Sequence, residues 1–112
     1  MPESDHTGAV LTIDLNAIVA NWLQLRDMLA SAECAAVVKA DAYGLGADRV
    51  APALSRAGCK TFFVAHVGEG VAVRRVLPKA TIHVLNGPVP GSETTLIDHR
   101  LVPVLNSLGD IE

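Results

Sequence analysis

The sequence predicts an α/β fold built on a parallel sheet. Apolar runs short enough for strands alternate with longer segments that suit helices, at a spacing of roughly 20 to 25 residues. Several runs are apolar at consecutive positions, as in parallel strands that are covered on both faces. Half of the 112 residues are hydrophobic but only 4% are aromatic, so the core must be built from aliphatic side chains.

The first segments are a tail, a strand and a helix. Residues 1–8 are polar and acidic and are expected to form a flexible N-terminal tail, and residues 9–13 suit a short strand. Asp14 or Asn16 is expected to cap the helix that follows. The apolar residues on one face of this helix recur at spacings of 4, 3 and 4: Ile18, Trp22, Leu25 and Leu29.

Four core strands and three connecting helices follow. The predicted strands are residues 34–38, 61–65, 81–85 and 101–105, and the predicted helices are residues 47–57, 69–77 and 92–98. Gly58 ends the first of these helices and Pro78 follows the second. Ser92 is expected to cap the third, and Asn106 or Ser107 to begin a further element. Pro52 is expected to be tolerated only in the first turn of a helix.

The length limits how much of a known architecture the chain holds. An eight-stranded βα barrel needs about 250 residues. We therefore expect residues 9–112 to form either about half of such a barrel or a complete small open sheet.

Composition excludes several classes of protein. The net charge is −3, from 9 basic and 12 acidic residues, and neither half of the chain has a basic block, so we expect no nucleic-acid partner. No apolar run approaches the ~18 residues of a membrane span. The N-terminus lacks the apolar stretch of a signal peptide. The two cysteines, Cys34 and Cys59, are interpreted as reduced, buried thiols of a cytoplasmic protein.

The stretch from residue 36 to residue 46 carries the chemistry. A buried strand ends at Lys39, and the carboxyl ends of strands are where α/β folds gather catalytic groups. A lysine among apolar residues is poorly hydrated, which lowers its pKa and makes it a usable amine nucleophile. Tyr43 offers a hydroxyl to an anionic ligand, and Gly44 and Gly46 let the backbone approach that ligand.

Two other interpretations of this stretch stay open on general grounds. Lys39 can extend from a strand end into solvent while the glycines serve a tight turn. Alternatively, Gly44 and Gly46 begin a dinucleotide fingerprint, although the position of its third glycine holds Arg49.

The pattern VKADAYGxG at residues 38–46 closely resembles the pyridoxal-phosphate attachment motif of the alanine racemase family. Two weaker blocks support the resemblance: IDLxAIxxN at residues 13–21 and TIxVLxG at residues 81–87. Position 45 departs from the pattern, because it is Leu where many members carry His. The resemblance implies a homodimer whose subunits have an N-terminal TIM-type (β/α)8 barrel, only the first half of which is present here, and a β-rich C-terminal domain.

The resemblance also implies a function and a site. The family uses pyridoxal 5'-phosphate to interconvert L-alanine and D-alanine, which supplies D-alanine for peptidoglycan. Lys39 would hold the cofactor as a Schiff base and serve as one of two bases, and Tyr43 would contact the cofactor phosphate. Val37 and Leu85 would be apolar neighbours of the cofactor. No metal ligand is predicted.

The second base of the family is a tyrosine from the C-terminal domain of the partner subunit, whereas the only tyrosine here is Tyr43. We therefore expect the chain by itself not to racemise alanine. One alternative is a non-catalytic half-barrel or assembly module that self-associates through exposed strand edges. Another is a related barrel-type pyridoxal-phosphate enzyme, such as a different racemase or a decarboxylase. His66 is expected to be structural or neutral, and His83 to be a packed core residue.

Overall fold

The computed structural model describes residues 8–112. Residues 1–7 of the predicted tail lie outside the described part. The strand predicted at residues 9–13 is wrong: the segment is exposed, with Val10 67% and Leu11 75% accessible, and the sheet does not include it. Apolar composition alone does not make a strand when no neighbouring strand pairs with it.

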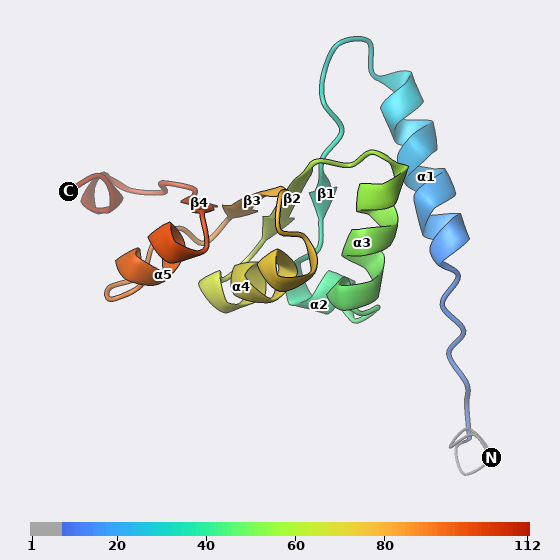
Figure 1. Ribbon diagram of the computed structural model, residues 1–112, viewed down its shortest axis with the longest axis horizontal. Helices are drawn as coiled ribbons and strands as arrows, with labels where there is room; N and C mark the ends of the chain where they lie inside the picture. Colours follow the sequence, from blue (N-terminus) through green and yellow to red (C-terminus); the bar gives the residue numbers. More distant parts are fainter. Residues whose placement is uncertain (1–7) are drawn as a thin grey trace.

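Four parallel strands form one sheet in the order β1-β2-β3-β4, which confirms the predicted α/β class. The strands are β1 (Ala36–Val37), β2 (Thr61–Val64), β3 (Thr81–Val84) and β4 (Leu101–Pro103). The helical elements are α1 (Leu15–Met28), α2 (Lys39–Tyr43), α3 (Ala47–Ala57), α4 (Val67–Val76), α5 (Glu93–Asp98) and a 3₁₀ turn at Leu108–Asp110. The helices follow the sheet as an outer arc, and α1 lies outside α3 (Figure 1).

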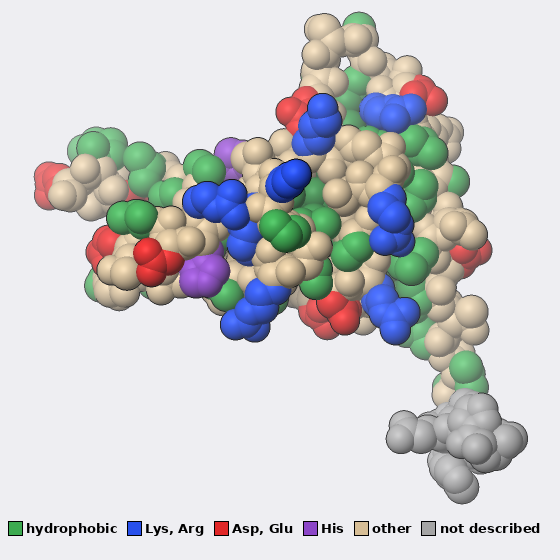
Figure 2. All heavy atoms as spheres, in the orientation of Figure 1, with side chains coloured by type: hydrophobic (Ala, Val, Ile, Leu, Met, Phe, Trp, Pro, Cys, Tyr) green, Lys and Arg blue, Asp and Glu red, His purple; other side chains and the backbone are tan. Residues whose placement is uncertain are grey.

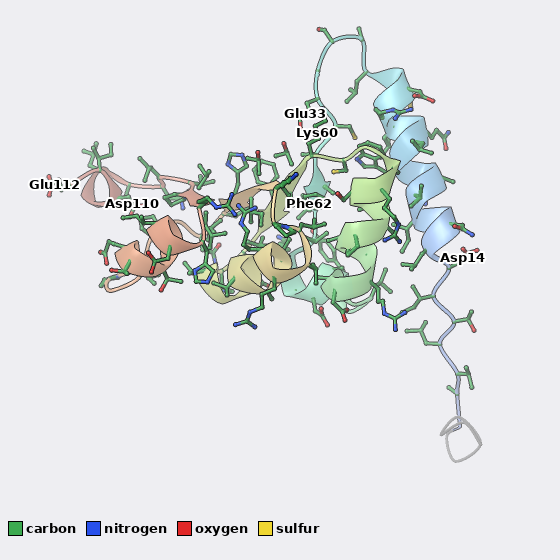
Figure 3. All side chains as sticks on the ribbon, in the orientation of Figure 1. Asp14, Glu33, Lys60, Phe62, Asp110 and Glu112 are labelled. Atoms are coloured by element: carbon green, nitrogen blue, oxygen red, sulfur yellow. The ribbon has the colours of Figure 1, made fainter. Side chains whose placement is uncertain are left out.

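Strand register sorts the side chains into a buried face and a partly open face. Phe62, which Figure 3 labels, pairs in register with Ala36 and Ile82, and all three are buried. The next row alternates to the other face, where Phe63 and His83 stack with ring centroids 4.7 Å apart. His83 is therefore packed against an aromatic ring, but it is only partly buried and is not the core residue that the sequence predicted.

Helix α1 packs on α3 through a narrower face than its periodicity predicts. Asp14 caps it, because its Oδ1 accepts a hydrogen bond from the backbone N–H of Ala17 at 3.2 Å. Trp22 is buried, but Leu25 and Leu29 are exposed. Because α3 is the main element that α1 contacts, only part of the predicted apolar stripe is covered.

Three predicted helix details need correction. Pro52 lies in the interior of α3, not in its first turn, so the helix forgoes one backbone hydrogen bond there. Helix α4 begins two residues before the predicted start at Glu69, because the Glu69 carboxylate accepts from the backbone N–H of His66 at 2.9 Å. Ser92 Oγ does not cap α5; it bonds the backbone N–H and C=O of Val89.

The two cysteines are free thiols. Cys59 is buried, as predicted, whereas Cys34 is only partly so. Burial raises the pKa of Cys59 to about 11, although a backbone hydrogen bond from Thr61 opposes this effect. Cys59 is therefore a protonated packing residue at neutral pH.

No helix in residues 8–112 is long and apolar enough to cross a membrane. On the face shown in Figure 2, Lys and Arg side chains lie among hydrophobic, acidic and neutral ones and do not form one continuous basic surface.

Arg74 of α4 joins the loops at the amino ends of the strands. It is buried, and its guanidinium donates to backbone carbonyl oxygens in the segments that precede β3 and β4. The acceptors are His99 (2.8 Å), Leu77 (3.2 Å), Pro78 (3.3 Å), Ala80 (2.5 Å) and Arg100 (2.9 Å). Burial lowers the pKa of Arg74, and the charge of Arg100 lowers it further. Carbonyl dipoles therefore replace a carboxylate as the partner of this cation.

Replacing Arg74 with methionine is expected to lower the free energy of unfolding by about 3 kcal/mol, because several carbonyl groups lose their donor at once. The measurement is urea unfolding followed by circular dichroism. Arg75→Met is the matched control, since Arg75 is exposed on the same helix and should change stability by less than about 0.5 kcal/mol. Equal stability of the two variants would contradict the role of Arg74.

Candidate functional site

The predicted site begins where β1 ends. Val38 extends the ladder by one bond, from its N–H to the Phe63 carbonyl at 2.9 Å, and its side chain is buried. Lys39 follows at the carboxyl edge of the sheet. The backbone leaves the extended conformation at Val38, where ψ is 26°, and the Lys39 side chain that follows is only partly buried.

The segment after Lys39 is a left-handed turn. Ala40, Asp41, Ala42 and Tyr43 have φ values of 51, 54, 56 and 56°. L-residues disfavour this conformation by about 1–2 kcal/mol each, and a strained turn persists only where surrounding contacts enforce it. The label α2 therefore covers a turn of the opposite hand to an ordinary helix.

Backbone hydrogen bonds hold this turn closed. Ala42 N donates to the Val38 carbonyl at 3.0 Å and Gly44 N to the Ala40 carbonyl at 2.9 Å. Asp41 ties the turn to the next helix, because its Oδ1 accepts from Ala47 N, the first residue of α3, at 2.8 Å. Gly44 ends the turn with a φ of 87°, which glycine adopts readily.

The turn brings two of the predicted site residues together. Lys39 Nζ lies 6.0 Å from the centroid of the Tyr43 ring, at the outer limit of a cation–π contact. Tyr43 is 63% exposed and Lys39 is partly buried. The described residues thus do not enclose Lys39 in the apolar surroundings that its sequence neighbours suggest.

The other two predicted residues lie farther along the same edge. Val37 is one position before Val38 on β1 and is 45% exposed. Leu85 follows β3, two strands away, where its N–H donates to the Val64 carbonyl at 2.7 Å. No hydrogen bond joins Leu85 to Lys39 among residues 8–112.

Polar side chains follow the neighbouring strands. His66 comes after β2 and Asn86 after β3, and the Asn86 amide nitrogen lies 3.3 Å from His66 Nδ1. Asn106, which follows β4, donates from Nδ2 to the Leu85 carbonyl at 3.0 Å. Since the strands are parallel, these side chains lie along the same edge as Lys39.

Glu69 is a residue of this edge that the sequence interpretation missed. Its Oε2 accepts from the backbone N–H of Ala40 at 2.6 Å, and its Oε1 accepts from those of Ala65 and His66 at 2.8 and 2.9 Å. A glutamate three positions after a helix cap was the available signal. Burial acts to raise the pKa of Glu69, but these backbone donors and the nearby His66 outweigh it and hold the pKa below its ordinary value.

Comparison with known proteins identifies the family. The family model described as alanine racemase, N-terminal domain, matches residues 13–112. The chain belongs to the alanine racemase family. Members of this family are racemases, a class of isomerase, and the match replaces the dinucleotide-binding interpretation of Gly44 and Gly46.

Curated relatives extend the similarity over almost the whole chain. The alanine racemase of Methylobacterium sp. strain 4-46 is 58% identical over 105 residues, which cover 94% of this chain and 29% of the relative. The alanine racemase of Brucella ovis is 54% identical over 106 residues, which cover 94% and 27%. The chain thus spans less than a third of the length of these relatives.

Solved structures agree on the fold. The alanine racemase of Bartonella henselae, solved with covalently bound pyridoxal phosphate, superposes with a TM-score of 0.85 at 48% identity over 88% of this chain and 28% of that one. The biosynthetic alanine racemase of Pseudomonas aeruginosa gives a TM-score of 0.80 at 34% identity, with 88% and 27% covered. The four βα units are therefore the first part of a TIM-type barrel, as predicted, and not a complete open sheet.

Replacing Glu69 with glutamine is expected to make stability less dependent on pH. The pKa of Glu69 is lower in the folded protein than its ordinary value of 4.5, so its stabilising effect is present above pH 4.5. That effect is lost as pH falls through the folded-state pKa. Urea unfolding of both proteins from pH 7 down to the acid transition tests this: the stability gap should narrow toward acid, and a gap independent of pH would contradict it.

Proposed function

We propose that this chain is the cofactor-bearing part of an alanine racemase, which interconverts L-alanine and D-alanine with pyridoxal 5'-phosphate. Residues 9–112 would be the N-terminal portion of its barrel domain, and Lys39 the residue that holds the cofactor. The observation that carries the proposal is the strained left-handed turn directly after Lys39, at the edge where barrels perform chemistry. The covalently bound pyridoxal phosphate of the Bartonella enzyme supports the choice of cofactor.

The residues present fit this cofactor. Its aldehyde reacts with a primary amine that the cofactor can approach from solvent. Lys39 carries such an amine at the carboxyl ends of the strands, and its side chain is only partly buried. The other two lysines differ, because Lys60 and Lys79 precede β2 and β3 and so lie at the amino ends of the strands; Figure 3 labels Lys60 there. The exposed Tyr43 has a hydroxyl free to donate to the phosphate.

Lys39 would also move the substrate's proton. When bound, pyridoxal phosphate stabilises the electron pair left at the α-carbon of an amino acid after that proton departs. The Lys39 amine is then free to accept or return the proton on one face of the α-carbon. Val37 and Leu85 would supply apolar walls that orient the cofactor.

Racemisation needs a second base on the opposite face of the α-carbon. Tyr43, the only tyrosine in the sequence, is assigned to the phosphate, so this chain supplies one base. We propose that the second is a tyrosine of the partner subunit's C-terminal domain, and that the chain alone does not racemise alanine. A cytoplasmic homodimer that supplies D-alanine for peptidoglycan completes the proposal.

Borohydride reduction after incubation with pyridoxal phosphate tests the assignment of Lys39. Mass spectrometry should find the reduced adduct on Lys39 in preference to Lys60 and Lys79, because only Lys39 lies at the carboxyl edge. Lys39→Ala should abolish the specific adduct, while the matched control Lys79→Ala should leave it unchanged. Labelling spread evenly over the three lysines would contradict the proposed site.

A further inference from the structure

The Glu69 carboxylate connects the turn after Lys39 to the neighbouring strand end. One oxygen accepts from Ala40 N at 2.6 Å, and the other accepts from Ala65 N and His66 N at 2.8 and 2.9 Å. Ala40 and Glu69 are 29 positions apart in sequence. A single side chain therefore bridges the carboxyl ends of β1 and β2.

The bond to Ala40 acts on Lys39 directly. The Ala40 N–H belongs to the peptide that leaves the Lys39 α-carbon, so fixing that N–H restricts the backbone rotation that follows Lys39. Ala40 is also the first of the four left-handed residues, with a φ of 51°. Among the side-chain bonds to this turn, the one from Glu69 thus acts nearest to Lys39, whereas Asp41 acts at its far end through Ala47.

We propose that Glu69 is a positioning residue: it fixes the peptide after Lys39 and thereby aims the lysine amine at the cofactor. This inference rests on the proposed function, in which Lys39 holds pyridoxal phosphate. Glu69 touches neither substrate nor cofactor in this scheme; it acts through the backbone of the turn.

The role requires a carboxylate of this length. Both oxygens are acceptors, and together they serve three N–H donors. Glutamine has one acceptor oxygen and an NH₂ group that cannot accept, so it serves only one side of the bridge. Aspartate keeps both oxygens but is shorter by one methylene group, so it cannot span the same two strand ends.

The test measures two quantities on the whole chain: the fraction of borohydride-trapped pyridoxal phosphate found on Lys39, and the hydrogen-exchange rate of the Ala40 amide. Glu69→Gln and Glu69→Asp are compared with wild type. Glu93→Gln is the matched control, because Glu93 is an exposed glutamate in the first turn of α5. Circular dichroism at the labelling temperature selects conditions in which every variant is folded.

The expected result is a loss of Lys39 selectivity of about tenfold in both Glu69 variants, with faster exchange at Ala40 and no change in Glu93→Gln. A purely structural cap would lower stability without changing which lysine of the folded protein is labelled. Wild-type selectivity in folded Glu69→Gln would overturn the inference.

The same experiment separates failure of the proposed function from failure of the positioning role of Glu69. If wild type shows no preference for Lys39, the proposed function fails, and the positioning role fails with it. If wild type prefers Lys39 and the folded Glu69 variants keep both that preference and the wild-type exchange rate at Ala40, the positioning role alone is overturned.

Discussion

Two charged side chains of α4 form hydrogen bonds with backbone groups at the two ends of the parallel strands. Arg74 donates to five carbonyl oxygens at the amino ends of the strands, and Glu69 accepts from three N–H groups at the carboxyl ends. Parallel strands leave such groups unpaired wherever the chain turns away, and burying them without partners is costly. One helix thus fixes the connections of β1 and β2 on one side and of β3 and β4 on the other.

The fold was predictable because its signals are local. Short apolar-rich runs marked all four strands, and Gly58 and Pro78 marked two helix ends. Predictions that needed a distant partner were less accurate. Residues 9–13 have strand composition but no neighbouring strand, and Pro52 is accommodated inside a helix, where packing outweighs its local preference. The start of α4 depended on the carboxylate of Glu69 reaching back to His66.

The site was predictable in part for the same reason. Lys39 and Tyr43 stand four residues apart in one motif, and the structure brings them together. Nothing in the composition of residues 40–43 requires a left-handed turn, since alanine and tyrosine prefer the opposite hand. The turn is imposed by its hydrogen bonds, including one to Glu69, 29 positions away, and a contact at that separation leaves no local pattern in the sequence.

That separation also limits when the bond can form during synthesis. During synthesis the N-terminal part of a chain emerges first, and β1 with its lysine precedes α4 by almost thirty residues. A chain that ends before Glu69 lacks the carboxylate that accepts from Ala40 N, so the strained turn after Lys39 is without that contact. We therefore expect the turn to reach its final conformation only after α4 has been made and has packed beside β1 and β2.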